Sequence, residues 1–311
     1  MSAPTQRQKA RAIGANRVCN LAPSRVAREN RRMSNPISDP LVENVVVDDI
    51  ASVVKLESTL EGVATVTMNR PRQRNAFDTL MIEGLTEAFR TLQSAEHIRV
   101  VFLTGAGGNF CAGGDLQWMA QATELTESDN RADAMTAAQM VKALADIPAI
   151  TVALVEGAAF GGGAGLIAAC DVALAAKDAQ FAFSEVKLGL TPAIISPFVV
   201  DAIGPSAARA LFVTGRAFDA EHALRIGLLH EVVADAAGMG EAKARLVAQA
   251  MAAAPGAVAD ARKLVSDVWG RPIDHGLMEE TAKRLAHRRV SDEGKEGVEA
   301  FLKRRKPSWA R

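Results

Sequence analysis

The sequence predicts an α/β core followed by a helical C-terminal region. Short apolar segments rich in β-branched residues recur between residues 52 and 175, and segments with apolar residues at helical spacing alternate with them. Near residue 240 the strand pattern stops, and amphipathic segments follow one another to the end. We therefore expect a disordered basic extension at 1–40, a core at 41–238 and a helical region at 239–311.

The core is expected to open with two strands and a helix. Ser52–Glu57 and Val63–Asn69 have the pattern of short strands, and Gly62 supplies the turn between them. Asp78 is a favourable helix N-cap, because its side chain can accept a hydrogen bond from the first helical turn. The apolar residues that follow it at helical spacing are Met81, Leu85, Ala88, Phe89 and Leu92.

Three later segments have the continuous apolar pattern of buried strands: Val100–Thr104, Ile150–Val155 and Asp171–Ala175. The first is followed by the glycine-rich loop 105–115 and the second by the glycine-rich stretch 157–165. The other expected elements are a helix from Leu116, a helix around 134–146 after a polar stretch at 121–133, an extended segment Gln180–Glu185, helices near 196–203 and 206–213, and a helix that Asp219 caps and Gly227 ends.

The composition narrows the functional class. Lysine plus arginine and aspartate plus glutamate each number 36, so the formal net charge is zero and nothing global favours nucleic acid or an anionic membrane. The cysteines, Cys19, Cys111 and Cys170, have no paired or metal-like spacing, which fits a reducing compartment and predicts a cytoplasmic protein. The histidines are scattered without a His-Glu-x-x-His pattern, so we expect no metal site.

Residues 1–32 are strongly basic and hold a single acidic residue, Glu29. Three interpretations stay open for this segment. It resembles an organelle transit peptide, it has the charge of an arm that binds nucleic acid, or it precedes the true initiator at Met33.

The glycine-rich stretch 157–165 raises the main functional question, because glycines usually mark a close approach to the backbone. A membrane-spanning interpretation of Ile150–Cys170 is weak, since five glycines crowd a window of the required length. An anion site is the stronger interpretation. Free N–H groups at a helix N-terminus carry partial positive charge and would stabilise an oxyanion made during a reaction. The loop Phe110–Asp115 is the expected source of a second N–H donor.

A dinucleotide-binding fingerprint also fits part of this stretch. Gly163-Ala-Gly165-Leu-Ile-Ala168 follows a strand, and Glu185 lies 20 residues beyond Gly165. We expect this match to be coincidental, because only Leu166–Cys170 separates the glycines from the next strand. A helix that short is not expected to cross back over a sheet.

The order of the motifs from about 50 to 309 resembles the enoyl-CoA hydratase/isomerase (crotonase) superfamily. This resemblance implies a ClpP-like spiral of ββα repeats followed by a helical trimerisation region, in a homotrimer or a hexamer built as a dimer of trimers. It also implies an acyl-CoA thioester substrate, with no cofactor apart from the coenzyme A of the substrate. The motifs that carry it are Asn69-Arg-Pro…Asn75-Ala, Phe110-Cys-Ala-Gly-Gly-Asp115, Gly157-Ala-Ala-Phe-Gly-Gly-Gly163, Cys170-Asp171, Phe183-Ser-Glu185…Gly189 and Glu296-Gly-Val-Glu-Ala-Phe-Leu-Lys-Arg-Arg305.

The resemblance also implies roles for individual residues. Gly114 and Gly162 would donate backbone hydrogen bonds to the thioester oxygen, and Ala112 would lie against the CoA adenine. Phe301 and Arg304 would add CoA contacts from the tail, across subunits. The other residues implied at the substrate are Arg74, placed near phosphate with Asn75 and Ala76 beside it, and Asp115 and Leu116. A solvated surface position is the plain alternative for both arginines.

The catalytic carboxylates are where the sequence departs from the family. Typical hydratases of this family have one glutamate at the position of Gly165 and a second at the position of Glu185, and only the second is present. In an apolar pocket, made by Phe181, Phe183 and Val186, a carboxylate has a raised pKa that suits proton shuttling. A loop carboxylate paired with Lys187 is the alternative for Glu185.

One carboxylate fits two reactions: hydration, with Glu185 acting on both the water and the α-carbon, or a Δ3,Δ2-enoyl-CoA isomerisation. The segments 165–171 and 184–197 are similar to those of bacterial 3-methylglutaconyl-CoA hydratases of leucine breakdown and of isohexenylglutaconyl-CoA hydratases. We therefore expect a hydratase for 3-methylglutaconyl-CoA or a related branched enoyl-CoA, with Ser196 and Lys187 as candidate partners for its second carboxylate. An RNA-binding crotonase homologue, in which the basic segment 1–32 binds RNA, is the alternative of another class.

Overall fold

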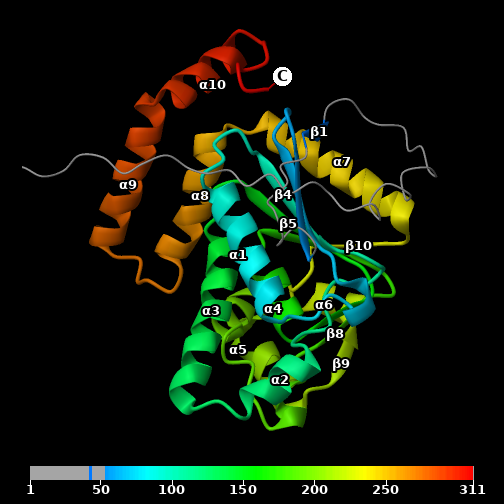
Figure 1. Ribbon diagram of the computed structural model, residues 1–311. Helices are drawn as coiled ribbons and strands as arrows, with labels where there is room; N and C mark the ends of the chain where they lie inside the picture. The colour runs from blue at the N-terminus through cyan, green and yellow to red at the C-terminus, as the bar shows by residue number, and fades with distance from the viewer. Residues whose placement is uncertain (1–41, 44–52, 311) are drawn as a thin grey trace, which may run out of the picture. The chain divides into compact units, whose positions relative to one another are not determined.

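The computed structural model describes residues 42–43 and 53–310 (Figure 1). The predictions for residues 1–32, including the RNA-binding arm, lie outside this part of the chain. A seven-stranded sheet has the order β1-β2-β3-β4-β5-β7-β10. Its strands are β1 (Val42–Glu43), β2 (Val54–Thr59), β3 (Val63–Met68), β4 (Val100–Gly105), β5 (Ile150–Val155), β7 (Val172–Ala176) and β10 (Glu231–Val233).

The predicted strands of the core are present within one or two residues of their expected bounds. β2 and β3 form an antiparallel hairpin, and Gly62 takes a φ of 90° in its turn, which favours glycine. From β3 onward the sheet is parallel. The central parallel strands β4 and β5 are almost entirely buried, which explains their continuous apolar pattern.

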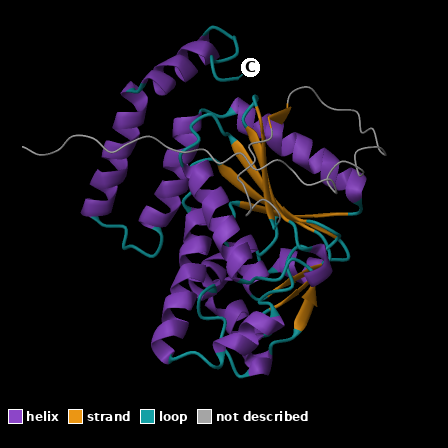
Figure 2. Cartoon of the chain, in the orientation of Figure 1, coloured by secondary structure: helices purple, strands orange, loops and turns teal. Residues whose placement is uncertain are grey.

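Helices cover both faces of this sheet (Figures 1 and 2). One face packs on α1 (Thr79–Gln93), α3 (Glu127–Ala145), α4 (Gly162–Ala168) and α5 (Ser196–Thr214), and the other on α7 (Ala236–Ala252). The Asp78 side chain accepts a hydrogen bond of 2.9 Å from the Met81 N–H, as predicted. α5 is interrupted at Gly204, which has a φ of 73°, and this break separates the two helices that were predicted near 196–203 and 206–213.

Three expectations about the elements are wrong. α3 begins at Glu127 instead of near 134, because Thr126 caps it by accepting from the Asp129 N–H. A second sheet, which was not expected, has the order β6-β8-β9. The strands β6 (Ala158–Phe160) and β9 (Ala217–Asp219) were not predicted, and β8 (Gln180–Ala182) is shorter than the predicted extended segment. The seven-residue α4 does return the chain to the same sheet, because β7 lies parallel beside β5.

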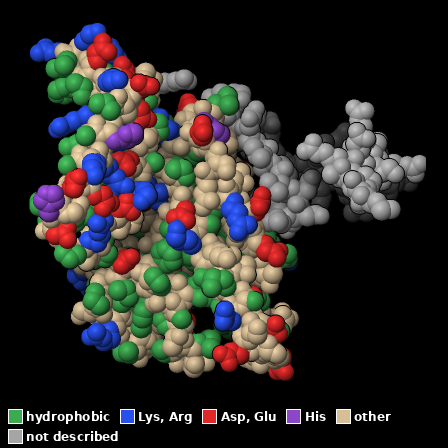
Figure 3. All heavy atoms as spheres, turned by 90° about the vertical axis from the view of Figure 1, so that its left-hand side faces the viewer, with side chains coloured by type: hydrophobic (Ala, Val, Ile, Leu, Met, Phe, Trp, Pro, Cys, Tyr) green, Lys and Arg blue, Asp and Glu red, His purple; other side chains and the backbone are tan. Residues whose placement is uncertain are grey.

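The C-terminal region is helical, as expected. It comprises α7, α8 (Pro255–Val268), α9 (His275–Val290) and α10 (Asp292–Leu302). Charged side chains of both signs are interspersed on the face drawn in Figure 3. Among the helices of the described residues, none is long and apolar enough to cross a membrane. The first of these helices, α7, begins at Ala236. The boundary between the core and the helical region, placed after residue 238, stays a prediction.

A half-buried ionic network joins α8 to the core. The Arg262 Nε lies 2.7 Å from Asp171 Oδ1, and the other guanidinium nitrogens donate to the backbone carbonyls of Ile147 and Ala145. Asp171 Oδ2 also accepts from the N–H and the hydroxyl of Thr151, at 2.7 and 2.9 Å. Every polar atom of the Asp171 carboxylate therefore has a partner.

We expect Arg262→Gln to lower the free energy of unfolding by about 3 kcal/mol, because it leaves the Asp171 carboxylate without its counter-charge. The matched control is Arg245→Gln, which removes a half-exposed ion pair with Glu231 and should cost less than about 1 kcal/mol. Urea unfolding midpoints measure both. Equal losses in the two variants would contradict this role for Arg262.

Candidate active site

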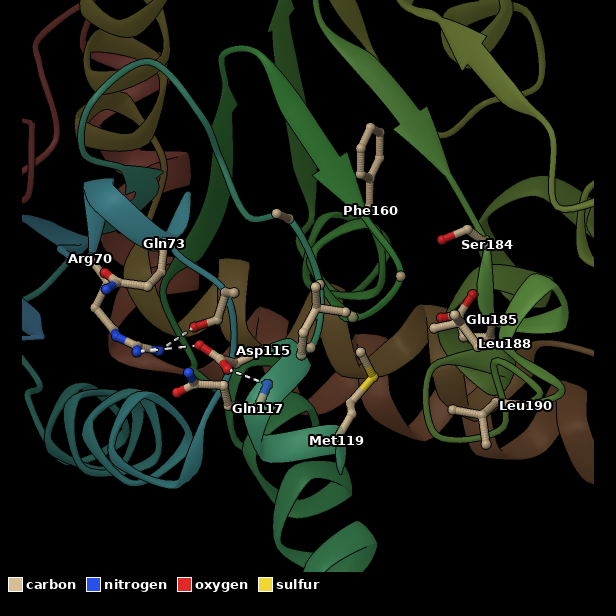
Figure 4. A pocket seen from close by; sticks show the side chains of 17 residues that line it. Arg70, Gln73, Asp115, Gln117, Met119, Phe160, Ser184, Glu185, Leu188 and Leu190 are labelled. Carbon is tan, nitrogen blue, oxygen red and sulfur yellow. Dashed lines mark hydrogen bonds and ion pairs between the residues drawn. The ribbon is translucent and has the colours of Figure 1, made fainter. Parts of the chain in front are cut away.

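A cavity of about 550 Å³ is lined by the end of the loop that follows β4, by the end of β6 and by the N-termini of α2 (Leu116–Ala122) and α4 (Figure 4). Polar side chains gather at one end of it, around Arg70 and Asp115, and Glu185 lies at the other end with Ser184, Leu188 and Leu190. The full lining is Arg70, Gln73, Ala76, Ala112, Gly113, Gly114, Asp115, Leu116, Gln117, Met119, Phe160, Gly161, Gly162, Ser184, Glu185, Leu188 and Leu190.

Two backbone segments run parallel to each other into this cavity. The Cys111 N–H donates to the Ala158 carbonyl at 3.0 Å, and the Phe160 N–H donates to the Cys111 carbonyl at 2.9 Å. Gly114 lies three residues beyond Cys111, and Gly162 lies three residues beyond Ala159, the partner of Cys111 in this bridge. Because the bridge holds the two segments side by side, both glycines lie in the lining of the same cavity.

The Gly114 N–H is free among the described residues. A second parallel bridge pairs Gly114 with Phe77, through Phe77 N–H to the Gly113 carbonyl and Asp115 N–H to the Phe77 carbonyl, both at 2.8 Å. In extended backbone, successive N–H groups point to opposite sides. The N–H of Gly114 thus points away from Phe77, and it has no acceptor within this part of the chain.

The Gly162 N–H is free because of its position in α4. It is the first helical residue, so its N–H has no acceptor inside the helix. The preceding N–H, of Gly161, donates to the Ala182 carbonyl of β8 at 2.8 Å, which fixes the start of the helix. Within the described residues nothing accepts from Gly162. Two residues with N–H groups that are uncommitted within the described chain therefore line one cavity, and their role as oxyanion donors stays a prediction.

Glu185 approaches the same backbone closely. A Cβ at Gly161, which has a φ of 49°, would lie 2.9 Å from Glu185 Oε1, so only glycine leaves room for the carboxyl group. The other oxygen, Oε2, is buried and has no hydrogen-bond partner among the described residues. Burial raises the pKa of the Glu185 carboxyl, and the N–H of the same residue opposes this by lowering it.

The apolar wall near Glu185 is not the predicted one. Phe181 and Phe183 are fully buried beneath the site, in a cluster of aromatic rings with Phe212 and Phe218. The residues that line the cavity beside Glu185 are Phe160, Met119, Leu188 and Leu190. Lys187 does not line it either, because its side chain packs against Gly215.

Seven of the predicted site residues line the cavity: Ala76, Ala112, Gly114, Asp115, Leu116, Gly162 and Glu185. Three predicted substrate contacts do not line it: Arg74, Phe301 and Arg304. Arg74 is exposed, and its carbonyl accepts from the Ala112 N–H at 2.9 Å. Phe301 is 83% exposed, on α10, and Arg304 is exposed just after it.

Arg70 is a lining residue that the sequence analysis missed. Its guanidinium lies 2.9 Å from Asp78 Oδ2 and 3.5 Å from Asp115 Oδ2, and it donates to the Ala76 carbonyl. Asp78 caps α1 and Asp115 caps α2, so one arginine holds the N-termini of both helices. Its place in the Asn69-Arg-Pro motif was the signal available in the sequence.

Asn75 connects the same loop to the loop that follows β4. Its side chain is fully buried and donates to the carbonyls of Ala106 and Asn109, at 2.9 and 2.7 Å. It accepts in turn from the Arg70 N–H at 2.9 Å. Asn75 therefore supports the backbone of the site and does not line the cavity.

The position of the missing glutamate is filled by another part of the chain. A Cβ at Gly165 would lie 2.1 Å from Cγ2 and 2.6 Å from Cβ of Ile195, which precedes α5. Ile195 is itself buried. No side chain fits at 165 in this arrangement, and Glu185 is the one glutamate in the cavity lining within the described residues.

This chain is similar in sequence and in fold to several known proteins. Residues 58–311 match the model of the enoyl-CoA hydratase/isomerase family. A Thermus thermophilus protein described as an enoyl-CoA hydratase is 33% identical over 249 residues, which cover 79% of this chain and 97% of that protein. A Legionella pneumophila structure described as an enoyl-CoA hydratase/isomerase (crotonase) has a TM-score of 0.78 and 41% identity, covering 83% of this chain and 99% of that one.

A third relative is Pseudomonas aeruginosa AtuE, whose structure has a TM-score of 0.80 and 37% identity, covering 83% of this chain and all of that one. The family match spans most of the chain and includes both glycine segments, Glu185 and the helical tail. This chain therefore belongs to the enoyl-CoA hydratase/isomerase family and has the crotonase fold.

Proposed function

We propose that the protein adds water across the double bond of a 2-enoyl-CoA thioester. One observation carries this proposal: Glu185, Gly114 and Gly162 line one cavity, and within the described residues the buried Oε2 of Glu185 and the two glycine N–H groups have no hydrogen-bond partner. The carboxyl group would handle the protons, and the N–H groups would bind the oxygen on which charge develops.

In the proposed reaction, Glu185 takes a proton from water while the water oxygen bonds to the β-carbon. The electron pair of the carbon–carbon double bond moves toward the thioester, and the enolate oxygen accepts hydrogen bonds from Gly114 and Gly162. Glu185 then gives the proton to the α-carbon, which restores the thioester carbonyl. The net change is the addition of one water, and the carboxylate is regenerated.

A Δ3,Δ2-enoyl-CoA isomerase is the second candidate. The observation that favours it is the absence of a carboxylate at position 165, where Ile195 fills the space. An isomerase only moves a proton between two carbons, so one carboxylate and the same enolate site suffice.

The preferred acyl chain of the substrate stays a prediction. The second carboxylate of 3-methylglutaconyl-CoA would need a cation as its partner in the cavity. Among the described lining residues Arg70 is the one lysine or arginine, and it is already paired with Asp78 and Asp115. The Ser196 hydroxyl donates to the Ala193 carbonyl at 2.8 Å and does not line the cavity.

The test is a substrate panel. Crotonyl-CoA, 3-methylglutaconyl-CoA and a 3-enoyl-CoA are offered separately, and the products are identified by mass. Hydration of either 2-enoyl thioester supports the proposal, and the ratio of the two kcat/KM values decides the acyl class. Conversion of the 3-enoyl-CoA to its 2-enoyl isomer, with no hydration of the others, would replace the hydratase by the isomerase.

We also propose that the protein is a homotrimer, or a hexamer of two trimers, in which Phe301 and Arg304 reach the CoA of a neighbouring subunit. Half of the exposed large hydrophobic residues of the described chain lie in the C-terminal tail, from residue 265 onward. Such a concentration of exposed apolar side chains marks an interaction surface. They are Val265, Trp269, Ile273, Met278, Leu285, Val290, Val298, Phe301 and Leu302.

We expect Phe301→Ser to shift the protein toward smaller species, because it removes an apolar side chain from this proposed interface. Leu60→Ser is the matched control, since Leu60 is also strongly exposed but lies in the turn between β2 and β3. Sedimentation equilibrium of both variants measures the change. A monomeric wild-type protein at micromolar concentration would contradict the proposal.

A further inference from the structure

We propose that Phe77 is a positioning residue that sets the spacing of the Gly114 and Gly162 N–H groups. The inference deepens the proposed function and rests on it, since the thioester oxygen is what these groups would bind. Phe77 is buried and does not line the cavity, so it acts through the two glycines and not on the substrate.

The backbone of Phe77 holds the first donor. Its N–H and carbonyl form both hydrogen bonds of the bridge to 113–115, each 2.8 Å long. These two bonds fix the peptide groups on either side of Gly114 and turn the Gly114 N–H to the opposite side. A displacement of residue 77 would therefore displace the first donor.

The ring of Phe77 holds the second donor. A Cβ at Gly162 would lie 2.6 Å from Phe77 Cε2 and 3.0 Å from Cδ2, so the ring lies directly against the Gly162 backbone. One residue thus bonds to the segment of Gly114 and contacts the first turn of α4.

The position of Phe77 is itself fixed by its neighbours. The preceding carbonyl, of Ala76, accepts from Arg70 at 2.9 Å, and the following residue, Asp78, pairs with the same guanidinium. Because closely packed groups transmit displacement, the two N–H groups and the N-terminus of α1 should move as one unit. A misplacement of about 1 Å at a reacting centre can cost about 100-fold in rate.

The test compares Phe77→Leu with Phe89→Leu. Phe89 is fully buried in the same hydrophobic core but lies within α1 and does not line the cavity, so its variant controls for lost packing. We expect both variants to lose similar stability. Only Phe77→Leu should lower kcat, by at least about 10-fold, while KM changes less than about 3-fold.

Infrared spectroscopy of a bound thioester that cannot be hydrated tests the role of Phe77 independently of the hydration rate. Butyryl-CoA labelled with ¹³C at its thioester carbonyl has no double bond to hydrate, and its infrared carbonyl stretch falls when the oxygen accepts hydrogen bonds. We expect a clear downward shift on binding to the wild-type protein and to Phe89→Leu, and a smaller shift with Phe77→Leu. Equal shifts in all three proteins would overturn the role of Phe77. No shift in the wild-type protein would instead overturn the proposed N–H donors.

Discussion

Glu185→Gln is expected to lower kcat for hydration by about 10³-fold, the middle of the range for general acid–base catalysis. Glutamine keeps the shape of the side chain but cannot take a proton from water. Glu185 is the one glutamate in the described cavity lining, and the one aspartate there, Asp115, caps α2 and pairs with Arg70, so we do not expect it to replace Glu185. Initial rates at saturating 2-enoyl-CoA measure the loss.

The control for this variant is Glu61→Gln, which changes an exposed carboxylate in the turn between β2 and β3 and should leave kcat unchanged. A Glu185→Gln enzyme that retained more than about a tenth of the wild-type kcat would show that another group moves the protons. The proposed mechanism would then be wrong even if the hydratase activity were real.

The raised pKa of Glu185 also predicts the pH dependence. As a base, the carboxyl group must be ionised, so the rate should rise with pH through a pKa above the ordinary glutamate value. The free energy of unfolding should change with pH in the opposite direction to the rate. Between the unfolded and the raised folded pKa the native state binds more protons, so wild-type stability falls as pH rises through that window.

Glu185→Gln should lack this loss of stability. Below the ordinary glutamate pKa the two proteins should unfold at similar urea concentrations, and above the raised pKa the variant should be the more stable. A variant that became progressively less stable than the wild type with rising pH would contradict a raised pKa at this site.

Gly165→Glu is expected to impair folding and not to restore a second catalytic carboxylate. Even the Cβ of this side chain would lie 2.1 Å from Ile195 Cγ2, far inside van der Waals contact. Gly165→Ala introduces that atom alone and should cost about 3 kcal/mol, since overpacking of a buried site forces neighbours to move. Urea unfolding of Gly165→Ala is the measurement.

Gly240→Ala is the matched control, because Gly240 also lies in a helix but has open space around its Cβ position. This variant should gain about 0.5–1 kcal/mol from the higher helix propensity of alanine. The double variant Gly165→Ala with Ile195→Ala should lose less stability than the sum of the two single variants, since Ile195→Ala removes the methyl group nearest to the new Cβ. Equal stabilities of Gly165→Ala and the wild type would show that Ile195 moves freely.

Local signals explain what the sequence predicted well. The caps at Asp78 and Asp219 depend on one side chain and the N–H group three residues later, so they can be identified without knowing the fold. The same is true of Gly161–Gly163 at the start of α4. β6 and β10 were missed, because three residues are too few to show a strand period.

Contacts between distant segments explain what the sequence analysis missed. Phe181 and Phe183 are next to Glu185 in the sequence but pack with Phe212 and Phe218, away from the cavity. Gly165 was identified as a missing carboxylate, but only the structure shows that Ile195, 30 residues later, occupies its space. The pairing of Arg70 with Asp115 likewise depends on the folded arrangement.

Turnover in H₂¹⁸O with crotonyl-CoA and 3-methylglutaconyl-CoA, followed by mass spectrometry of the thioester product, shows directly whether the protein adds water to the double bond. We expect the wild-type protein to form a 3-hydroxyacyl-CoA that carries one ¹⁸O atom, and Glu185→Gln to form about 10³-fold less of it per unit time. Unchanged thioesters with the wild-type protein, together with isomerisation of a 3-enoyl-CoA, would contradict this expectation.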